Sequence, residues 1–273
     1  MLLVDDNRVN QQLTTLQLQK LGCDVDVAAD GQQALDALGK QKYSLVLMDC
    51  SMPVMDGYDA TRAIRAAEAG TDQHMTIIAV TANALREDRE KCLAAGMDDY
   101  IAKPIKLIAL HNVLANWLKM PESEETITPT LEGRRPRTAS VPLSLREMLA
   151  AVPALEVLDA TQIATIRALQ SPDSPDVVAI VIGEFRRESP DLIRTMRESL
   201  AHGDYGELTR AAHSLKSSSA YVGAQILSRN SAELERTASS GQGDCIAPEQ
   251  IDALDAELQR VLAALEQITP ASV

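Results

Sequence analysis

The chain has 273 residues, 45% of them hydrophobic and 3% aromatic, so it is long enough for two ordinary domains with aliphatic cores. The formal net charge is −13, which divides into −4 over residues 1–119, −1 over residues 120–140 and −8 over residues 141–273. Neither half has the basic excess that binding to a phosphate backbone requires, so nucleic acid is excluded as an expected partner.

The sequence carries no sign of membrane insertion or secretion. No apolar stretch approaches the roughly 18–20 residues that span a bilayer, and no basic-then-apolar signal peptide opens the chain. The four cysteines are scattered without a C-x-x-C pair, which favours free thiols over disulfides or zinc. We therefore expect a cytoplasmic protein with no membrane segment in this chain.

The start of the chain is unusual. Only Met1 to Val4 precede an acid pair, whereas strands usually run about five or six residues. The first strand is therefore expected to be clipped, and the chain to be the end part of a longer polypeptide. Tethering through a membrane sensor that precedes this part stays open.

Residues 1–119 alternate short β-type runs with helical patterns. Five such units predict a doubly wound α/β domain with a five-stranded parallel sheet and helices on both faces. The expected strands are Leu2–Val4, Asp24–Ala28, Ser44–Met48, Thr76–Val80 and Asp98–Ile101. The expected helices lie near residues 8–21, 31–40, 57–69, 86–95 and 105–119.

The second half of the chain has a different pattern. Residues 120–142 carry charge, Pro and Gly with little apolar periodicity, which predicts a linker. Residues 143–273 show helical periodicity only, which predicts an all-α bundle whose short breaks favour antiparallel neighbours. The expected helices lie near residues 144–151, 159–169, 176–201, 204–220, 223–239 and 249–267.

Three acids follow two of the expected strands. Asp5 and Asp6 come after the first strand, and Asp49 comes after the third. Because the carboxyl ends of parallel strands share one edge of the sheet, these side chains are expected to lie together. Carboxylates that cluster raise one another's pKa unless a cation is present, and Mg²⁺ prefers hard oxygen ligands. The pattern therefore predicts a magnesium site.

Two more polar residues are expected at the same edge. Thr81 follows the fourth strand, and Lys103 follows the fifth. A carboxylate can attack phosphorus as a nucleophile, while a metal ion and an ammonium neutralise the phosphoryl oxygens and a hydroxyl adds a hydrogen bond. The set indicates that Asp49 forms an acyl phosphate.

These residues give residues 1–119 a clear resemblance to the receiver domains of two-component systems, which have a flavodoxin-like fold. Singly each motif is weak, and together they are highly specific. The matching segments are Asp5-Asp6-Asn7, Asp49, Met52-Pro53-Val54-Met55-Asp56-Gly57, Thr81-Ala82 and Lys103-Pro104.

The resemblance implies a role for each residue of the pocket. Asp49 would be the phosphoacceptor, and Thr81 and Lys103 would bind the phosphoryl group. Mg²⁺, or Mn²⁺ in its place, would sit on Asp6, Asp49 and the Ser51 backbone carbonyl, and on Asp5 largely through water. Tyr100 matches the switch aromatic of the family.

The same motifs also have simpler interpretations. Asp56-Gly57 is expected to be a turn, and Lys103-Pro104 also to open a helix. The chain also resembles haloacid-dehalogenase-type phosphatases, which use similar groups. In that family, however, the nucleophile lies in an Asp-x-Asp motif on the first strand. Here the first strand ends in adjacent aspartates and the isolated Asp49 follows the third, which favours the receiver.

His213 is the informative residue of the helical half. On a helix, Leu208, Ala212, Leu215 and Ser219 form the core face, and His213 points roughly 120° away from its centre. A hydrogen-bonded core histidine therefore fits poorly, and an ordinary exposed histidine stays open on geometry alone. Lys216 lies at i+3 and Ser217 at i+4, so a cation and a small residue flank the imidazole.

Residues 141–273 resemble histidine phosphotransfer (HPt) domains, which are helical bundles. The motif runs from His213-Ser214-Leu215-Lys216-Ser217-Ser218 through Gly223-Ala224 to Leu234-Glu235. The resemblance implies that His213 carries a phosphoryl group, which the Lys216 cation stabilises. Ser217 stands where the family usually has Gly, so its hydroxyl either narrows the approach of a partner or hydrogen-bonds the imidazole.

The two resemblances together imply the C-terminal part of a hybrid sensor histidine kinase. The phosphoryl group would pass from an upstream kinase histidine to Asp49, then to His213, then to a downstream response-regulator receiver. No ATP-binding motif of the histidine-kinase type occurs in the chain, so enzymatic activity of the chain alone stays open. The alternative is a non-catalytic interaction module that switches on phosphorylation and uses the bundle for docking.

Overall fold

The computed structural model describes residues 1–81, 86–118, 157–170 and 176–268. The expected linker over residues 120–142 and the expected helix over residues 144–151 lie outside the described residues. Every other expected strand and helix is present, with ends that shift by at most two residues.

The first domain is a parallel sheet of five strands in the order β2-β1-β3-β4-β5, which confirms the doubly wound arrangement. The strands are β1 Leu2–Val4, β2 Asp26–Ala28, β3 Val46–Asp49, β4 Ile77–Thr81 and β5 Asp99–Ala102. The helices are α1 Arg8–Lys20, α2 Gly31–Lys40, α3 Gly57–Glu68, α4 Arg86–Ala95 and α5 Leu107–Leu118.

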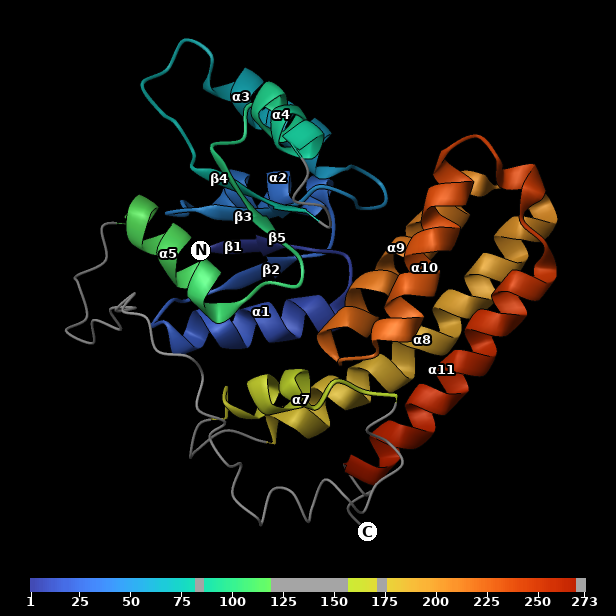
Figure 1. Cartoon of the computed structure of the whole chain (residues 1–273). Coiled ribbons are helices and arrows are strands. Elements are labelled where there is room, and N and C mark those ends of the chain that lie inside the picture. The colour runs from blue at the N-terminus through green and yellow to red at the C-terminus, as the bar shows by residue number, and fades with distance from the viewer. Residues whose placement is uncertain (82–85, 119–156, 171–175, 269–273) are drawn as a thin grey trace, which may run out of the picture.

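Alternate residues of the strands build two separate apolar layers. Leu3 of β1 and Leu47 of β3 belong to the cluster that includes residues of α1 and α5. Leu2 and Met48 belong to a second cluster with residues of α2, α3 and α4. Because side chains alternate along a strand, each face of the sheet is covered by its own helices (Figure 1).

The second domain is a helical bundle, as expected. Its helices are α7 Ala160–Arg167, α8 Val177–His202, α9 Tyr205–Tyr221, α10 Gln225–Ser239 and α11 Pro248–Ile268. Helix α8 contacts α9 and α11, and α10 contacts the same two helices, so these four form a closed bundle with α7 against α8. None of the described helices has the length and apolar content needed to cross a membrane.

The tight turn between α8 and α9 depends on one glycine. Gly203 has a φ of 69°, a left-handed conformation that glycine adopts without steric cost. The next residue, Asp204, caps α9 by accepting a hydrogen bond from the Glu207 N–H at 2.9 Å. The chain therefore reverses within three residues, which explains the antiparallel packing of these helices.

Two expectations about local structure are wrong. Asp56 is the N-cap of α3 and Gly57 is its first residue, so this pair starts a helix rather than forming a simple turn. A Cβ on Gly57 would lie 2.1 Å from the Asp49 carbonyl oxygen, so glycine lets α3 approach the end of β3 closely. Pro104 lies before the first turn of α5, which begins only at Leu107.

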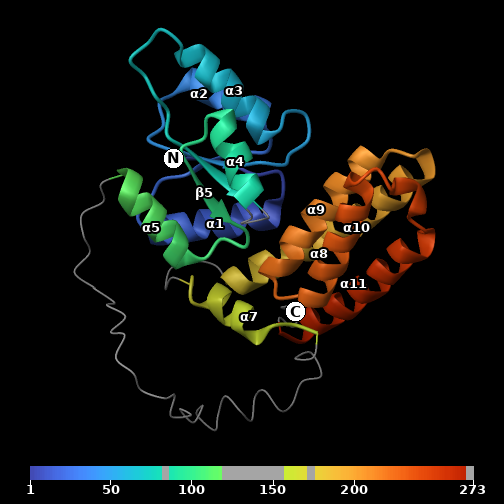
Figure 2. The same cartoon turned by 45° about the horizontal axis from the view of Figure 1, so that its top comes forward.

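The two domains pack against each other in one chain (Figure 2). Helix α1 contacts both α8 and α9, and Arg8 of α1 forms an ion pair with Glu188 of α8 at 3.6 Å. The apolar cluster of α1 and α5 continues without a break into the bundle. The carboxyl edge of the sheet therefore faces the helix that carries His213.

Candidate functional site

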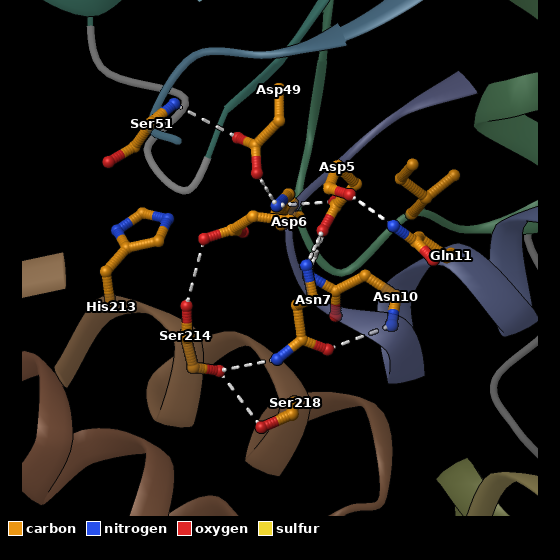
Figure 3. Close-up of polar contacts among 12 residues, drawn as sticks. Asp5, Asp6, Asn7, Asn10, Gln11, Asp49, Ser51, His213, Ser214 and Ser218 are labelled. Atoms are coloured by element: carbon orange, nitrogen blue, oxygen red, sulfur yellow. Dashed lines mark hydrogen bonds and ion pairs between the residues drawn. The ribbon is translucent and has the colours of Figure 1, made fainter. Parts of the chain in front are cut away.

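The three acids meet at the carboxyl edge of the sheet, as the sequence predicts. Asp5 and Asp49 are 3% and 1% exposed, and Asp6 is half-buried. Each of the three offers a carboxylate oxygen, and these oxygens all lie within 4.8 Å of one another (Figure 3). Such a group of hard oxygen ligands suits a divalent cation.

Lys103 reaches into the same pocket from the residue after β5. Its Nζ lies 2.6 Å from Asp49 Oδ2 and 2.8 Å from Asp5 Oδ2. Burial alone would lower the pKa of Lys103, but the charges of the two carboxylates outweigh burial and raise it above the ordinary value. The ammonium is therefore charged and is held between the two acids.

The acid pair remains electrostatically strained despite this cation. Burial raises the pKa of Asp5, the Lys103 charge lowers it, and Asp49 raises it further, so that the net direction is upward. The pKa of Asp6 rises to about 8, because of burial and the neighbouring charges of Asp49 and Asp5. One ammonium is thus insufficient for three clustered carboxylates, and the pocket favours a further cation.

Short contacts fix the orientation of Asp5. The Asn7 backbone N–H donates to Asp5 Oδ1 at 2.9 Å, and Asn10 Nδ2 donates to the same oxygen at 3.1 Å. Asn7 also caps α1, because its side chain accepts from the Asn10 N–H at 3.1 Å. The first turn of α1 therefore sets the geometry of the pocket, and Asn10 is a contributor that the sequence reasoning missed.

Thr81 and Ser51 lie near the pocket, and Tyr100 does not. Thr81 ends β4, and its carbonyl accepts the Lys103 backbone N–H at 2.7 Å. The Ser51 N–H donates to Asp49 Oδ1 at 3.3 Å. Tyr100 is half-buried against the apolar cluster that contains Leu2 and Met48. The Arg89 guanidinium carbon lies 5.9 Å from its ring centre.

His213 is buried, so the expectation that a core histidine fits this position poorly is wrong. It is 8% exposed, and its neighbours Ser214, Ser217 and Ser218 are buried as well. The expected core residues Leu208, Ala212, Leu215 and Ser219 are buried on the bundle side. Spacing along α9 reports only the face that packs in the bundle, whereas the first domain covers the opposite face of α9.

A carboxylate that the sequence reasoning gave no role holds His213 in place. Glu235 of α10 lies 2.6 Å from His213 Nδ1 through Oε1 and 2.6 Å from Lys216 Nζ through Oε2. Burial would raise the pKa of Glu235, but the contacts with His213 and Lys216 outweigh burial and lower it. An ionised Glu235 thus accepts a hydrogen bond from the Nδ1–H group. The lone pair of the neutral ring then lies on Nε2.

The second nitrogen of His213 is buried and unpartnered. Nε2 has no hydrogen-bond partner among the described residues, and neither has the hydroxyl of Ser217. The alternative that Ser217 hydrogen-bonds the imidazole is therefore wrong. A buried ring nitrogen without a partner costs free energy, which points to a functional reason for its placement.

The helix of His213 touches the acid pocket directly. The Ser214 hydroxyl donates to Asp6 Oδ2 at 3.5 Å, and Asn7 Nδ2 donates to the Ser214 carbonyl at 3.4 Å. Figure 3 shows the His213 ring on the same side of α9 as these contacts, where it faces Ser51 and Asp49. Residues from four strand ends and two helices of the bundle therefore form one site.

Comparisons with known protein families divide the chain in the same way. A family model described as the response regulator receiver domain matches residues 1–115, and a model described as the Hpt domain matches residues 181–264. These matches favour the receiver over the haloacid-dehalogenase-type phosphatase.

Two curated relatives are histidine kinases of much greater length. The chain is 40% identical over 137 residues to Histidine kinase 1 of Arabidopsis thaliana, covering 38% of this chain and 11% of that protein. It is 45% identical over 118 residues to Hybrid signal transduction histidine kinase I of Dictyostelium discoideum, covering 41% of this chain and 7% of that protein. The chain thus spans a small part of these relatives.

Two solved structures are similar to part of the chain. The receiver domain of the sensor histidine kinase PA1611 from Pseudomonas aeruginosa, solved with a magnesium ion in its active site cleft, is 50% identical over 43% of this chain and 95% of that chain, with a TM-score of 0.40. The Saccharomyces cerevisiae complex of the histidine phosphotransfer protein Ypd1 with the receiver domain of Ssk1 is 29% identical over 46% of this chain and 92% of the matched chain, with a TM-score of 0.41.

The chain therefore carries a response regulator receiver domain followed by an Hpt domain, the pair of domains that serves a phosphorelay in two-component signalling.

Proposed function

We propose that Asp49 and His213 are two consecutive stations of a phosphorelay, and that the phosphoryl group passes from Asp49 to His213. The observation that carries this proposal is the placement of His213. Its Nε2 is buried and has no partner in the described part of the chain, and it lies on the face of α9 that contacts the acid pocket of Asp49. A histidine held for structural reasons alone would be expected to use both ring nitrogens.

A divalent cation fits the acid pocket. Asp5, Asp6 and Asp49 supply hard oxygen atoms, and the raised pKa of Asp6, about 8, reflects an unmet demand for positive charge. Mg²⁺ or Mn²⁺ would be held by Asp6, Asp49 and the Ser51 carbonyl, and by Asp5 largely through water. When bound, the ion neutralises charge on the phosphoryl oxygens.

In the first step, Asp49 accepts the phosphoryl group from an upstream kinase histidine. A carboxylate oxygen of Asp49 attacks phosphorus, the bond from phosphorus to the donor nitrogen breaks, and the electron pair returns to the donor imidazole. Lys103 Nζ, 2.6 Å from Asp49 Oδ2, neutralises the transferred oxygens, and the Thr81 hydroxyl donates a hydrogen bond to them.

In the second step, His213 takes the phosphoryl group from Asp49. The lone pair of Nε2 attacks phosphorus, the acyl phosphate bond breaks, and its electron pair returns to the Asp49 carboxylate. The ring becomes positively charged, with its proton on Nδ1, 2.6 Å from the Glu235 carboxylate. Glu235 stabilises that charge, and Lys216 offers a cation next to the phosphorylated ring.

The remaining features of the proposal follow from the domain pair. The partners are an upstream histidine kinase domain, in the same or another polypeptide, and a downstream response-regulator receiver. The receiver domain spans residues 1–119, the linker residues 120–142 and the HPt domain residues 143–273. Tyr100 serves as the switch residue together with Thr81, and the location is cytoplasmic.

Labelling with acetyl phosphate and Mg²⁺ tests the assignment of the two stations. We expect a base-labile acyl phosphate on Asp49, and Asp49→Asn to abolish its formation. Asp56→Asn is the matched control, because Asp56 caps α3 a few residues away from the pocket. His213→Gln should keep the label on Asp49 and block its onward transfer to a separate receiver. Normal labelling of Asp49→Asn would contradict the role of Asp49.

A further inference from the structure

Tyr221, the last residue of α9, reaches from the bundle into the receiver domain. Its hydroxyl accepts a hydrogen bond from the Ile105 backbone N–H at 2.8 Å. Tyr221 and Ile105 are both 4% exposed, so the contact lies in the interior of the domain interface. In the sequence, Tyr221 lies between the His213–Ser218 and Gly223-Ala224 segments of the HPt motif, and neither segment gives it a role.

The contact secures the loop that carries Lys103. Ile105 lies two residues after Lys103, and its carbonyl accepts a hydrogen bond from Gln17 Nε2 at 3.0 Å. Both backbone polar groups of Ile105 are thus satisfied by side chains, one from α1 of the receiver and one from α9 of the bundle. A buried amide that loses its acceptor is costly, so removal of the Tyr221 hydroxyl weakens this packing.

The side chain of Tyr221 is buried against apolar side chains of both domains. Leu13, Ile105 and Ile166 belong to one apolar cluster that includes Tyr221 and joins the two domains. Thr14 of α1 also hydrogen-bonds the tyrosine side chain. Burial raises the pKa of Tyr221 to about 12, so the phenol stays neutral near pH 7 and accepts the amide as a hydroxyl.

Helix α9 therefore touches the receiver at two points. Ser214 contacts Asp6 and Asn7 beside His213, and Tyr221 contacts Ile105 near the end of the helix. The two contact points are seven residues apart, about 10 Å along the helix axis at 1.5 Å per residue. Two separated contacts fix both the distance and the angle of α9 relative to the pocket.

We propose that Tyr221 is a positioning residue for phosphoryl transfer within the chain. By capping the Ile105 amide, it holds the Lys103 loop of the chain's own receiver against α9 and aligns the acid pocket with Nε2 of His213. The effect of Tyr221 on phosphoryl transfer rests on the proposed function. Its hold on the Lys103 loop rests on the hydrogen bond from the Ile105 amide alone.

Amide hydrogen exchange in the full chain without phosphate tests the structural content. In Tyr221→Phe, we expect the Ile105 amide to exchange about tenfold faster than in the wild type. The matched control is Tyr205→Phe at the other end of α9, where the hydroxyl donates to Asp244 at 2.6 Å on the surface. That control should leave Ile105 unchanged, and the amide of the buried Leu258 should be unchanged in both variants.

Unchanged exchange at Ile105 in Tyr221→Phe would overturn the proposal. Faster exchange at Leu258 in that variant would also overturn it, because the effect would then be a general loosening of the bundle.

A single-turnover assay with labelled acetyl phosphate and Mg²⁺ tests the consequence. We expect Tyr221→Phe to label Asp49 at the wild-type rate but to pass the label to His213 about tenfold more slowly, while Tyr205→Phe transfers normally. A wild-type transfer rate in Tyr221→Phe would overturn the positioning role. If the wild type itself never labels His213, the proposed function fails, and the exchange at Ile105 still decides whether Tyr221 holds the loop.

Discussion

The two phosphoryl sites of the chain are built in opposite ways. The receiver pocket is crowded with charge, since the Lys103 ammonium lies within hydrogen-bonding distance of both Asp5 and Asp49. At the histidine site, Glu235 is the one charged partner of the ring among the described residues, and none of these residues hydrogen-bonds the other nitrogen of His213. The charges of the receiver pocket thus stabilise a phosphoryl group on Asp49, whereas Nε2 of His213 can accept that group. Mutations at the two sites should therefore affect different steps.

The largest effect is expected from the cation of the receiver pocket. Lys103→Met removes the ammonium that neutralises the phosphoryl oxygens, so labelling of Asp49 should slow by about 10²-fold or more. Binding of Mg²⁺ should persist, because the variant leaves the three carboxylates without their internal cation. Measured rates of labelling by acetyl phosphate, with titration of Mg²⁺, check both statements.

The matched control for this variant is Lys106→Met. Lys106 is exposed and lies three residues further along the same loop. It should label at the normal rate. Equal rates for Lys103→Met and the wild type would remove Lys103 from the mechanism.

A smaller effect is expected at the histidine site, and it should fall on the second transfer step rather than on the labelling of Asp49. Glu235→Gln keeps an acceptor for Nδ1 but loses the negative charge that stabilises the imidazolium, so transfer to His213 should slow by about tenfold. Labelling of Asp49 should not change. Glu233→Gln, an exposed glutamate on the same helix, is the control, and a single-turnover measurement of His213 phosphorylation distinguishes the variants.

If Glu235→Gln slowed the labelling of Asp49 as well, the two sites would not be separable in the way the structure indicates. The control should match the wild type in both steps.

The receiver pocket should also make the stability of the chain depend on pH. The pKa of Asp6 is raised from 3.8 to about 8 in the folded state, so folding favours the protonated form. The resulting stability is present at low pH and is lost as the pH rises from about 4 towards 8. Mg²⁺ should counter that loss, because it replaces the proton as the source of positive charge.

Thermal unfolding with and without Mg²⁺ checks this prediction. At about pH 8.5, Mg²⁺ at about 100 times its Kd should raise the Tm of the receiver transition by about 5–10 °C. Near pH 5.5 the increase should be smaller, since protons then compete for the carboxylates. Asp6→Asn should reduce the pH dependence, and an equal effect of Mg²⁺ at both pH values would contradict the role of the acid pair.

The smallest effect is expected beside the histidine. The Ser217 hydroxyl is buried without a partner, so Ser217→Ala should raise the free energy of unfolding by ~1 kcal/mol. Ser218→Ala is the contrast, because its hydroxyl donates to the Ser214 carbonyl at 2.9 Å and its loss should destabilise by a similar amount. Denaturant unfolding of both variants measures the difference, and destabilisation by Ser217→Ala would indicate a contact that the structure lacks.

The pocket could be predicted from the sequence because its geometry follows from topology. Asp5, Asp49, Thr81 and Lys103 each end or follow a strand of a parallel sheet, and such ends share one edge. The order of β-type runs and helical patterns was therefore sufficient to bring these residues together. The contribution of Asn10 was missed because an amide within a helix gives no signal of the side chain it faces.

The histidine site was predicted only in part. Spacing along α9 correctly identified the core face, but it carries no information on what covers the opposite face. The pairing of His213 with Glu235 joins residues 22 apart on two helices, and the contact of Tyr221 with Ile105 joins residues 116 apart. Contacts of this kind depend on how helices and domains pack, which periodicity in one segment does not determine.

The rate of transfer from Asp49 to His213 at different chain concentrations tests the central claim most directly. The docked domains predict that label first appears on Asp49 and then on His213, with a rate that does not change over a hundredfold dilution of the chain. A rate that falls in proportion to dilution would contradict transfer within the chain. A label that never reaches His213 would contradict the relay itself.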